Sequence, residues 1–506
     1  MTISQNRRSP RDPDEWHESR YTAVRGASSI ADALTTETSS LSSAHLEAVG
    51  ARERGLGPGR GHAPHPAGDR ASLPPVLLTA SRYLGTLAAV RAFGRAGVPT
   101  VVADDARLGA ASWSRFVNRR LKCPPDSQPQ QLLEWLLAFG KEHPGHVLCA
   151  TSDESAWLYS KYRAELSQHF HMYQPTVDAV HLLLNKRRLY DVGRAENVDF
   201  PRTWFPESED DLRTVVREAH FPVLTKPVTQ ILHKTHTKGV VVENPEPLGG
   251  FFRFMSRDMY QPELLAFDPS GMPPMVQEYQ PTALEGIYSI SGFIDERGTV
   301  FGLRATKKVL QRPRSLGVGV CFERDAVKPA LVDAIVRMCR RVGYYGVFEV
   351  EFIHRDGKDL LIDFNPRFYG QMAFDIARGL PVPLLLYYAA LGEWRTVKEL
   401  SEAAEQQASH EPVDVHCNRI DFEIMLRAQR LSGAMSAEDV KVWRNWYERH
   451  RGRIVHPIRD TDDWKPFATE IVRQFLEYMR HPRASLKSSM LKGLLIGPYL
   501  QQLQSL

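Results

Sequence analysis

Residues 343–371, GYYGVFEVEFIHRDGKDLLIDFNPRFYGQ, contain the pattern that decides the fold. Two apolar runs in this stretch, GVFEVEFI and DLLIDFN, flank a DGK turn. Strand-like runs on either side of such a turn predict an antiparallel hairpin. Because alternate side chains of a strand share a face, Asp363 and Asn365 are expected to point the same way. The hairpin would place Glu351 opposite this row, with Glu349 one step further along.

The polar row in this hairpin has the chemistry of a magnesium site. Carboxylate and amide oxygens from two paired strands suit Mg²⁺, which shares its remaining coordination positions with phosphate oxygens and water. Arg367 follows in the same row and can hold a phosphate or a carboxylate through two parallel hydrogen bonds. A solvated strand face is the alternative, but phenylalanines alternate with the polar residues and demand burial on the other side. The sequence therefore predicts that Glu351, Asp363 and Asn365 bind Mg²⁺, with Mn²⁺ as the alternative ion.

Length and composition limit the class of protein. A chain of 506 residues is long enough for two or three domains. Its 64 Lys and Arg residues nearly balance 60 Asp and Glu residues, which gives no basic surface for a nucleic-acid partner. The five cysteines lack CxxC or His-pair spacing, so neither a disulfide framework nor a zinc site is expected. With no signal peptide and no bilayer-length apolar run, the sequence predicts a soluble cytoplasmic protein without a membrane partner.

The residues from 76 to 104 predict a parallel βαβ unit. VLLTA and VPTVVAD read as strands, and YLGTLAAVRAFGRAG between them reads as an amphipathic helix. The turn after the first strand has one glycine where a dinucleotide-binding fingerprint has three, so a nicotinamide site is the less favoured interpretation. A further strand, HVLCA, leads to Ser152, Asp153 and Glu154, and this end of an α/β strand is the usual place of a ligand-facing loop.

The 343–371 stretch resembles the C-terminal signature of the ATP-grasp superfamily, nearest to the carboxylate-amine ligase branch that includes D-aspartate ligase-like enzymes. The resemblance implies an α/β and α+β fold, the ATP-grasp fold, with an N-terminal pre-ATP-grasp α/β domain and then two α+β subdomains that grip ATP. The predicted boundaries are a disordered tail at 1–73, the α/β domain at 74–180, the ATP-grasp domain at 181–393 and a mostly helical C-terminal extension at 394–506.

The resemblance also implies roles for individual residues. Glu351, Asp363 and Asn365 would bind the magnesium ions, and Arg367 would face the transferred phosphate. Lys226, in LTKPV, resembles the superfamily lysine that contacts the α- and β-phosphates of ATP, with an exposed lysine at a strand end as the alternative.

Two further segments resemble phosphate-binding parts of the superfamily less closely. Lys186, in LLLNKRRL, resembles the earlier phosphate lysine, but its arginine neighbours leave a solvated basic helix face as the alternative. The loop QILHKTHTKG has only Gly239 where the superfamily loop is glycine-rich so that backbone N–H groups can approach the phosphates. Its side-chain cations would take over that role, and they are His233, Lys234, His236 and Lys238.

The stretch MVQEYQPTALEGIYSISGF resembles the hinge between the two halves of the grasp. There the backbone of Gln277, Glu278, Tyr279 and Gln280 would pair with the adenine edge of ATP. Glu285 would accept hydrogen bonds from the ribose hydroxyls. The turn after the hinge lacks the PG of the superfamily, so a surface acid is the alternative for Glu285.

The predicted activity is that of an ADP-forming, ATP-dependent carbon-nitrogen ligase, which activates a carboxylate as an acyl phosphate and passes the acyl group to an amine. Its partners would be small-molecule carboxylate and amine substrates, with amino acids as candidates. Arg304, in the LRATKK strand, is a candidate clamp for the carboxylate or acyl phosphate, together with Arg312 or Arg314. A phosphotransferase that stops at the phosphorylated product and a nucleotide-binding regulator without turnover stay open as alternatives. The sequence identifies neither the substrates nor the oligomeric state, for which a homodimer is one option.

Overall fold

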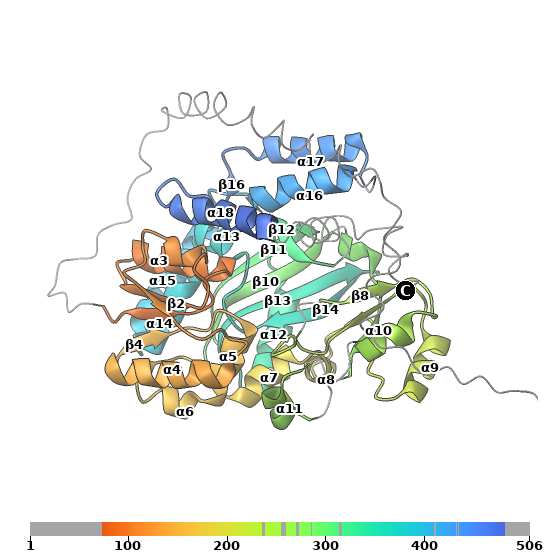
Figure 1. Cartoon of the computed structure of the whole chain (residues 1–506), viewed down its shortest axis with the longest axis horizontal. Coiled ribbons are helices and arrows are strands. Elements are labelled where there is room, and N and C mark those ends of the chain that lie inside the picture. The colour runs from red at the N-terminus through yellow and green to blue at the C-terminus, as the bar shows by residue number, and fades with distance from the viewer. Residues whose placement is uncertain are drawn as a thin grey trace, which may run out of the picture. The chain divides into compact units, whose positions relative to one another are not determined.

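The computed structural model describes residues 73–480, apart from 235–237, 255–259, 270–272, 285, 313–315, 409–410, 432 and 434. The predicted tail up to residue 72 lies outside the described residues, as do His236, Glu285, Arg314 and the end of the chain from residue 481. Three β-sheets organise the described part (Figure 1).

A five-stranded parallel sheet comes first, with the strand order β3-β2-β1-β4-β5. Its strands are β1 (Val76–Leu78), β2 (Thr100–Asp104), β3 (Arg119–Lys122), β4 (His146–Leu148) and β5 (Phe170–His171). The accompanying helices are α3 (Leu84–Arg95), η2 (Ala111–Trp113), α4 (Pro129–Glu142), α5 (Asp153–Lys161) and α6 (Arg163–Leu166). Alternate residues of β1 enter two different cores, Leu77 on one face and Val76 on the other, which is why the strand is apolar throughout. The predicted βαβ unit is confirmed, because β1 and β2 pair in parallel with α3 between them.

A four-stranded antiparallel sheet follows, with the strand order β6-β9-β7-β8. Its strands are β6 (Thr203–Trp204), β7 (Val223–Lys226), β8 (Val240–Val242) and β9 (Met275–Glu278). The helices around it are α7 (Val177–Leu184), α8 (Lys186–Ala195), α9 (Glu209–Glu218), α10 (Leu248–Phe254) and α11 (Pro262–Phe267). The Lys186 backbone N–H donates to the Val228 carbonyl oxygen at 2.7 Å, which ties the start of α8 to the chain leaving β7.

The third sheet has seven strands in the order β14-β13-β10-β11-β12-β15-β16. Its strands are β10 (Ile287–Ile294), β11 (Val300–Arg312), β12 (Val318–Asp325), β13 (Gly346–Arg355), β14 (Lys358–Asn365), β15 (Val415–Cys417) and β16 (Ile454–Val455). The hairpin of β13 and β14 turns at Asp356 and Gly357, whose φ angles of 52° and 75° are the left-handed pair that an Asp-Gly turn adopts. Figure 1 shows β10, β11, β13 and β14 running side by side through the centre of the molecule.

The C-terminal part contributes to this sheet as well as adding helices. The helices before residue 394 are η4 (Pro281–Leu284), α12 (Pro329–Val342), α13 (Met372–Ala377) and α14 (Val382–Ala390). Those of the C-terminal part are α15 (Trp394–Gln407), α16 (Arg419–Leu431), α17 (Ala437–Arg449) and α18 (Lys465–Arg480). The sequence predicts this part as mostly helical, and the structure adds β15 and β16 to the sheet edge. Buried Asp463 also anchors it to the first domain, through Arg91 Nε at 3.0 Å and Ser114 Oγ at 2.6 Å.

A parallel α/β sheet followed by an antiparallel sheet and by a mixed sheet in which β15 and β16 pair in parallel, with helices around them, confirms the predicted α/β and α+β class. One buried cluster takes residues from all three sheets, among them Leu77, Met275 and Phe348. No helix in the described part of the chain combines the length and the apolar composition needed to cross a bilayer.

Candidate functional site

The β13-β14 hairpin has the predicted register. Glu351 lies opposite Asp363, and Glu349 lies opposite Asn365. Directly opposite residues of an antiparallel pair share a face, so all four side chains stand on one side of the sheet. The Asp-Gly turn sets the pairing up to Phe352 and Leu361, and a register shift between Phe352 and Glu351 then brings Asp363, in place of Ile362, opposite Glu351.

Each of the two acids predicted to bind metal is paired with a lysine. Lys186 Nζ lies 2.8 Å from Asp363 Oδ1, and Lys308 Nζ lies 2.8 Å from Glu351 Oε1. Lys186 comes from the first turn of α8, where the Asn185 side chain caps the helix. The structure therefore brings Lys186 to the site, as the resemblance implies, and adds Lys308 from β11.

Lys226 completes this cationic group. It lies at the end of β7 and is buried. The pKa of Lys226 is lowered to about 7, first by burial and then by the Lys186 ammonium, against the opposing effect of Asp363 and Glu351. Burial would raise the pKa of Asp363, but Lys186, Lys226 and Lys238 together hold it below its usual range. The site is thus a set of mutually interacting charges from both antiparallel sheets.

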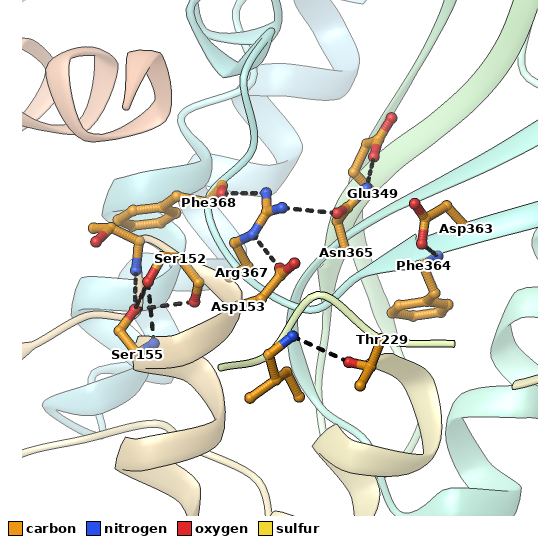
Figure 2. Close-up of polar contacts among 12 residues, drawn as sticks. Ser152, Asp153, Ser155, Thr229, Glu349, Asp363, Phe364, Asn365, Arg367 and Phe368 are labelled. Carbon is orange, nitrogen blue, oxygen red and sulfur yellow. Dashed lines mark hydrogen bonds and ion pairs between the residues drawn. The ribbon is translucent and has the colours of Figure 1, made fainter. Parts of the chain in front are cut away.

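Arg367 is fixed by three hydrogen bonds (Figure 2). Its Nε donates to Asp153 Oδ1 at 2.7 Å, Nη1 donates to the Phe368 carbonyl oxygen at 2.9 Å, and Nη2 donates to Asn365 Oδ1 at 2.9 Å. Asp153 is the first residue of α5, at the end of the segment after β4 that the sequence predicts as ligand-facing. The parallel sheet thereby contributes an acid to the group formed by the two antiparallel sheets.

Glu349 is the most deeply buried acid of this row. Its carboxylate accepts from Asn365 Nδ2 at 2.6 Å and from Gln371 Nε2 at 2.8 Å. Burial, and then the nearby Glu351 carboxylate, raise the pKa of Glu349 to about 7. Its hydrogen bond to Nδ2 turns the Asn365 amide so that Oδ1 faces Arg367, as Figure 2 shows.

The donor set fits a magnesium ion through its two carboxylates. Glu351 and Asp363 face each other across the hairpin, and both carry hard oxygen donors. The amide oxygen of Asn365 is engaged by Arg367 in this arrangement. Among the described residues no three His, Cys, Asp or Glu side chains gather as a ready-made metal site, and both acids hold a lysine instead.

Arg304 is placed differently from Arg367. It is buried, with Nε 3.0 Å from Glu411 Oε1, and its Nη2 donates to the carbonyl oxygens of Arg378 and Ala404. Arg312 pairs with Asp421. These contacts join β11 to the C-terminal part, so the structure does not bring Arg304 into contact with the lysines and acids above.

The predicted adenine-binding segment begins inside a sheet. Gln277 is buried, and its Nε2 donates to Tyr190 Oη and to Thr203 Oγ1, each at 2.9 Å. The backbone N–H of Glu278 donates to the Arg202 carbonyl oxygen.

The next two hinge residues also have partners inside the protein. The backbone N–H of Tyr279 donates to the Pro222 carbonyl oxygen. Gln280 Oε1 accepts from Arg355 Nη1 at 2.7 Å, whereas Gln280 Nε2 is buried without a hydrogen-bond partner in the described part of the chain.

In the glycine-poor loop, His233 is buried and its ring lies edge-on against Tyr260, with centroids 4.8 Å apart. Packing of this kind places His233 in the protein interior. Lys238 is close enough to Asp363 to lower the pKa of that carboxyl.

Comparison with solved structures found weak similarities. The biotin carboxylase domain of 2-oxoglutarate carboxylase from Hydrogenobacter thermophilus aligns with a TM-score of 0.49 and 15% identity, over 64% of this chain and 71% of that chain. L-amino acid ligase from Bacillus licheniformis aligns with a TM-score of 0.48 and 14% identity, over 64% of this chain and 76% of that chain. Biotin carboxylase from Campylobacter jejuni aligns with a TM-score of 0.46 and 14% identity, over 65% of this chain and 70% of that chain. No protein-family model and no curated protein matches the chain.

Sequence reasoning missed Lys308 and the pairing of Asp153 with Arg367. Lys308 lies on β11 two positions after Thr306 and four after Arg304. Because alternate residues of a strand share a face, the sequence could have placed Lys308 on the same face as the predicted clamp Arg304. Asp153 was recognised as ligand-facing, but its pairing with Arg367 joins residues 214 positions apart and has no local signature.

Proposed function

We propose that the chain is an ATP-dependent carboxylate-amine ligase that forms ADP and works through an acyl phosphate. The observation that carries the proposal is the meeting of two lysines with two acids across the antiparallel sheets. Lys226 and Lys186 approach from the smaller sheet and its helix, while Asp363 and Glu351 stand on the hairpin. Lysine ammonium groups match phosphate oxygens, and carboxylates match the magnesium ion that accompanies ATP.

Phosphoryl transfer asks a protein mainly for positioning and for neutralisation of charge. Lys186 and Lys226 would hold the phosphates, and Arg367 would meet the charge that develops on the transferred group. Asp363 and Glu351 would hold magnesium, with Asn365 as the third predicted ligand. Magnesium, when bound, supplies charge neutralisation between the phosphate oxygens.

The chemistry proceeds in two displacements. In the first, a substrate carboxylate oxygen attacks the γ-phosphorus, the bond from phosphorus to the β,γ-bridging oxygen breaks, and ADP leaves with that oxygen. In the second, the amine nitrogen attacks the acyl carbon, the carbon-oxygen bond to phosphate breaks, and inorganic phosphate leaves while the nitrogen gives up a proton. No protein nucleophile is needed, which agrees with a site made of cations and acids.

The test is ADP release by the full chain with MgATP against a pairwise panel of amino acids, with the product identified by mass spectrometry. We expect ADP and phosphate to form in equal amounts, together with an amide, only when a carboxylate and an amine are both present. Lys226→Met should abolish turnover, while Lys358→Met, at the exposed start of β14, should leave it unchanged.

Each other outcome points to a specific alternative. ADP formed without amine consumption, with a stable phosphorylated product, would identify a phosphotransferase. ATP binding without ADP release from any pair would identify the regulator that the glycine-poor loop around Gly239 suggests.

A further inference from the structure

We infer that Asp153 is a positioning residue that holds Arg367 in place for the transferred phosphoryl group. The inference rests on the proposed function, and adds a residue of the parallel sheet to it. Asp153 acts through Arg367 and is not expected to touch the substrate itself.

The backbone of Asp153 is well fixed. Asp153 is the first residue of α5, and the preceding Ser152 caps that helix by accepting from the Ser155 N–H. Ser152 Oγ also donates to Asp126 Oδ2 at 2.7 Å, so the loop after β4 is tied to the loop after β3. An acid anchored in this way can hold a long arginine side chain in one rotamer, because the surrounding hydrogen bonds already fix the position of the acid.

The chain around Arg367 is fixed by the same loop. The Phe368 N–H donates to the Ala150 carbonyl oxygen at 3.3 Å, three residues before α5 begins. The backbone of this segment is therefore attached at Ala150, and the Arg367 side chain at Asp153, both in the chain that follows β4. Figure 2 shows the second of these contacts.

The remaining donors of Arg367 are suited to an oxyanion. A guanidinium has five N–H donors, and three of those in Arg367 have partners among the described residues. One N–H remains on each terminal nitrogen. Because Asp153 takes Nε, the two terminal nitrogens are the ones left to bind phosphoryl oxygens.

The neighbouring acid, Glu154, does not take the place of Asp153. Burial, and then the Asp153 carboxylate, raise the pKa of Glu154 to about 8, so Glu154 is mostly protonated at neutral pH. The carboxylate that Arg367 contacts is that of Asp153. A rival role is that Asp153 occupies the place of a substrate carboxylate and is displaced on binding.

The first test measures binding of two probes by isothermal titration: Mg²⁺ with ADP, and Mg²⁺ with ADP and aluminium fluoride, which mimics the transferred phosphoryl group. For Asp153→Ala we expect unchanged affinity for ADP and a loss of about 10²-fold for the fluoroaluminate complex, the usual penalty for a reacting group misplaced by about 1 Å. Asp153→Asn, whose Oδ1 can still accept from Nε, should lose less. Asp178→Asn removes an exposed acid from the first turn of α7 and controls for the lost interaction with a helix N-terminus.

The second test is a double-mutant cycle on the fluoroaluminate affinity. If Asp153 acts through Arg367, Asp153→Ala should have no further effect in the Arg367→Ala background. Additive losses, an unchanged fluoroaluminate affinity in Asp153→Ala, or a gain in affinity as displacement predicts would each overturn the inference. A parent chain that binds neither probe overturns the proposed function and this inference together, whereas a parent that binds both while Asp153→Ala matches it overturns this inference alone.

Discussion

The binding of nucleotide should weaken as pH rises through neutrality, because Lys226 loses its proton there. The pKa of Lys226 is lowered to about 7 by burial and by Lys186. Lysine ordinarily keeps its charge to about pH 10, so an unperturbed lysine in this place would give no change in this range. The perturbation to examine is Lys226→Met, which keeps the length and apolar body of the side chain and removes its charge.

The expected magnitude follows from the charged fraction. A group with a pKa of about 7 is roughly 90% protonated at about pH 6 and roughly 10% protonated at about pH 8. If the phosphates bind only to the ammonium form, affinity for MgADP falls about tenfold across this interval. The sign follows from the phosphates, whose negative charge favours the protonated lysine, so binding takes up a proton and is favoured by acid.

The unliganded protein should respond to pH in the opposite direction. Between about pH 7 and about pH 10 the unfolded chain holds a proton on residue 226 that the folded chain lacks. The free energy of unfolding therefore rises with pH across this window as far as Lys226 is concerned. General denaturation by acid or base would lower stability and nucleotide affinity together. A rise in stability with a fall in affinity, as pH increases, therefore points to Lys226.

The assay is isothermal titration of MgADP into parent and Lys226→Met at constant ionic strength from about pH 6 to about pH 8. Glu349 also titrates near neutrality, with its pKa raised to about 7, but it is present in both proteins, so their difference isolates Lys226. We expect the tenfold slope in the parent alone. A flat parent profile, or equal slopes in the two proteins, would refute the reasoning.

Other residues give three further expectations. Asp363→Asn should abolish Mn²⁺ binding in the presence of ADP, measured by electron paramagnetic resonance, while Asp356→Asn at the exposed turn should not; equal Mn²⁺ affinities would remove Asp363 from the metal site. Arg304→Met should lower the melting temperature because it leaves buried Glu411 with Arg378 as its remaining guanidinium partner, whereas a substrate clamp would show a raised KM for the carboxylate at unchanged melting temperature. Asp463→Ala should cost about 3 kcal/mol of unfolding free energy by removing the nearer acid of buried Arg91 and leaving it only Asp460, at 3.9 Å, and the exposed neighbour Asp462→Ala should cost little; similar denaturation midpoints would contradict this.

The hairpin and the shared face of its polar residues were predictable because their causes are local. Alternation places Asp363 and Asn365 on one face, the apolar runs set the strands, and the Asp-Gly turn joins them. The register shift between Glu351 and Phe352, which brings Glu351 opposite Asp363, has no such local signature. Lys226 and Lys186 were predicted from their resemblance to the phosphate lysines of the ATP-grasp superfamily, and that role stays a prediction. The structure brings both lysines to the predicted acids.

What the sequence did not reveal depends on distant contacts. The burial of Arg304 needs Glu411, which lies in the part of the chain predicted as a separate helical extension. β15 and β16 have three and two residues, too few for a period of alternation to register. The hinge was predicted from backbone alone, and the side-chain bonds of Gln277 to Tyr190 and Thr203 could be found only in the folded chain.

The pairing of lysines with acids bears on how the proposed ligands would enter. Asp363 and Glu351 each hold a lysine at 2.8 Å, so a metal ion arriving alone would have to displace two ammonium groups that then lack partners. Phosphates arriving alone would draw Lys186 and Lys308 away and leave the two carboxylates unpaired. MgADP or MgATP supplies both replacements at once, a cation for the acids and anions for the lysines. Under the proposed function, each ligand should therefore raise the affinity for the other by the same factor, since coupling between two binding equilibria is reciprocal.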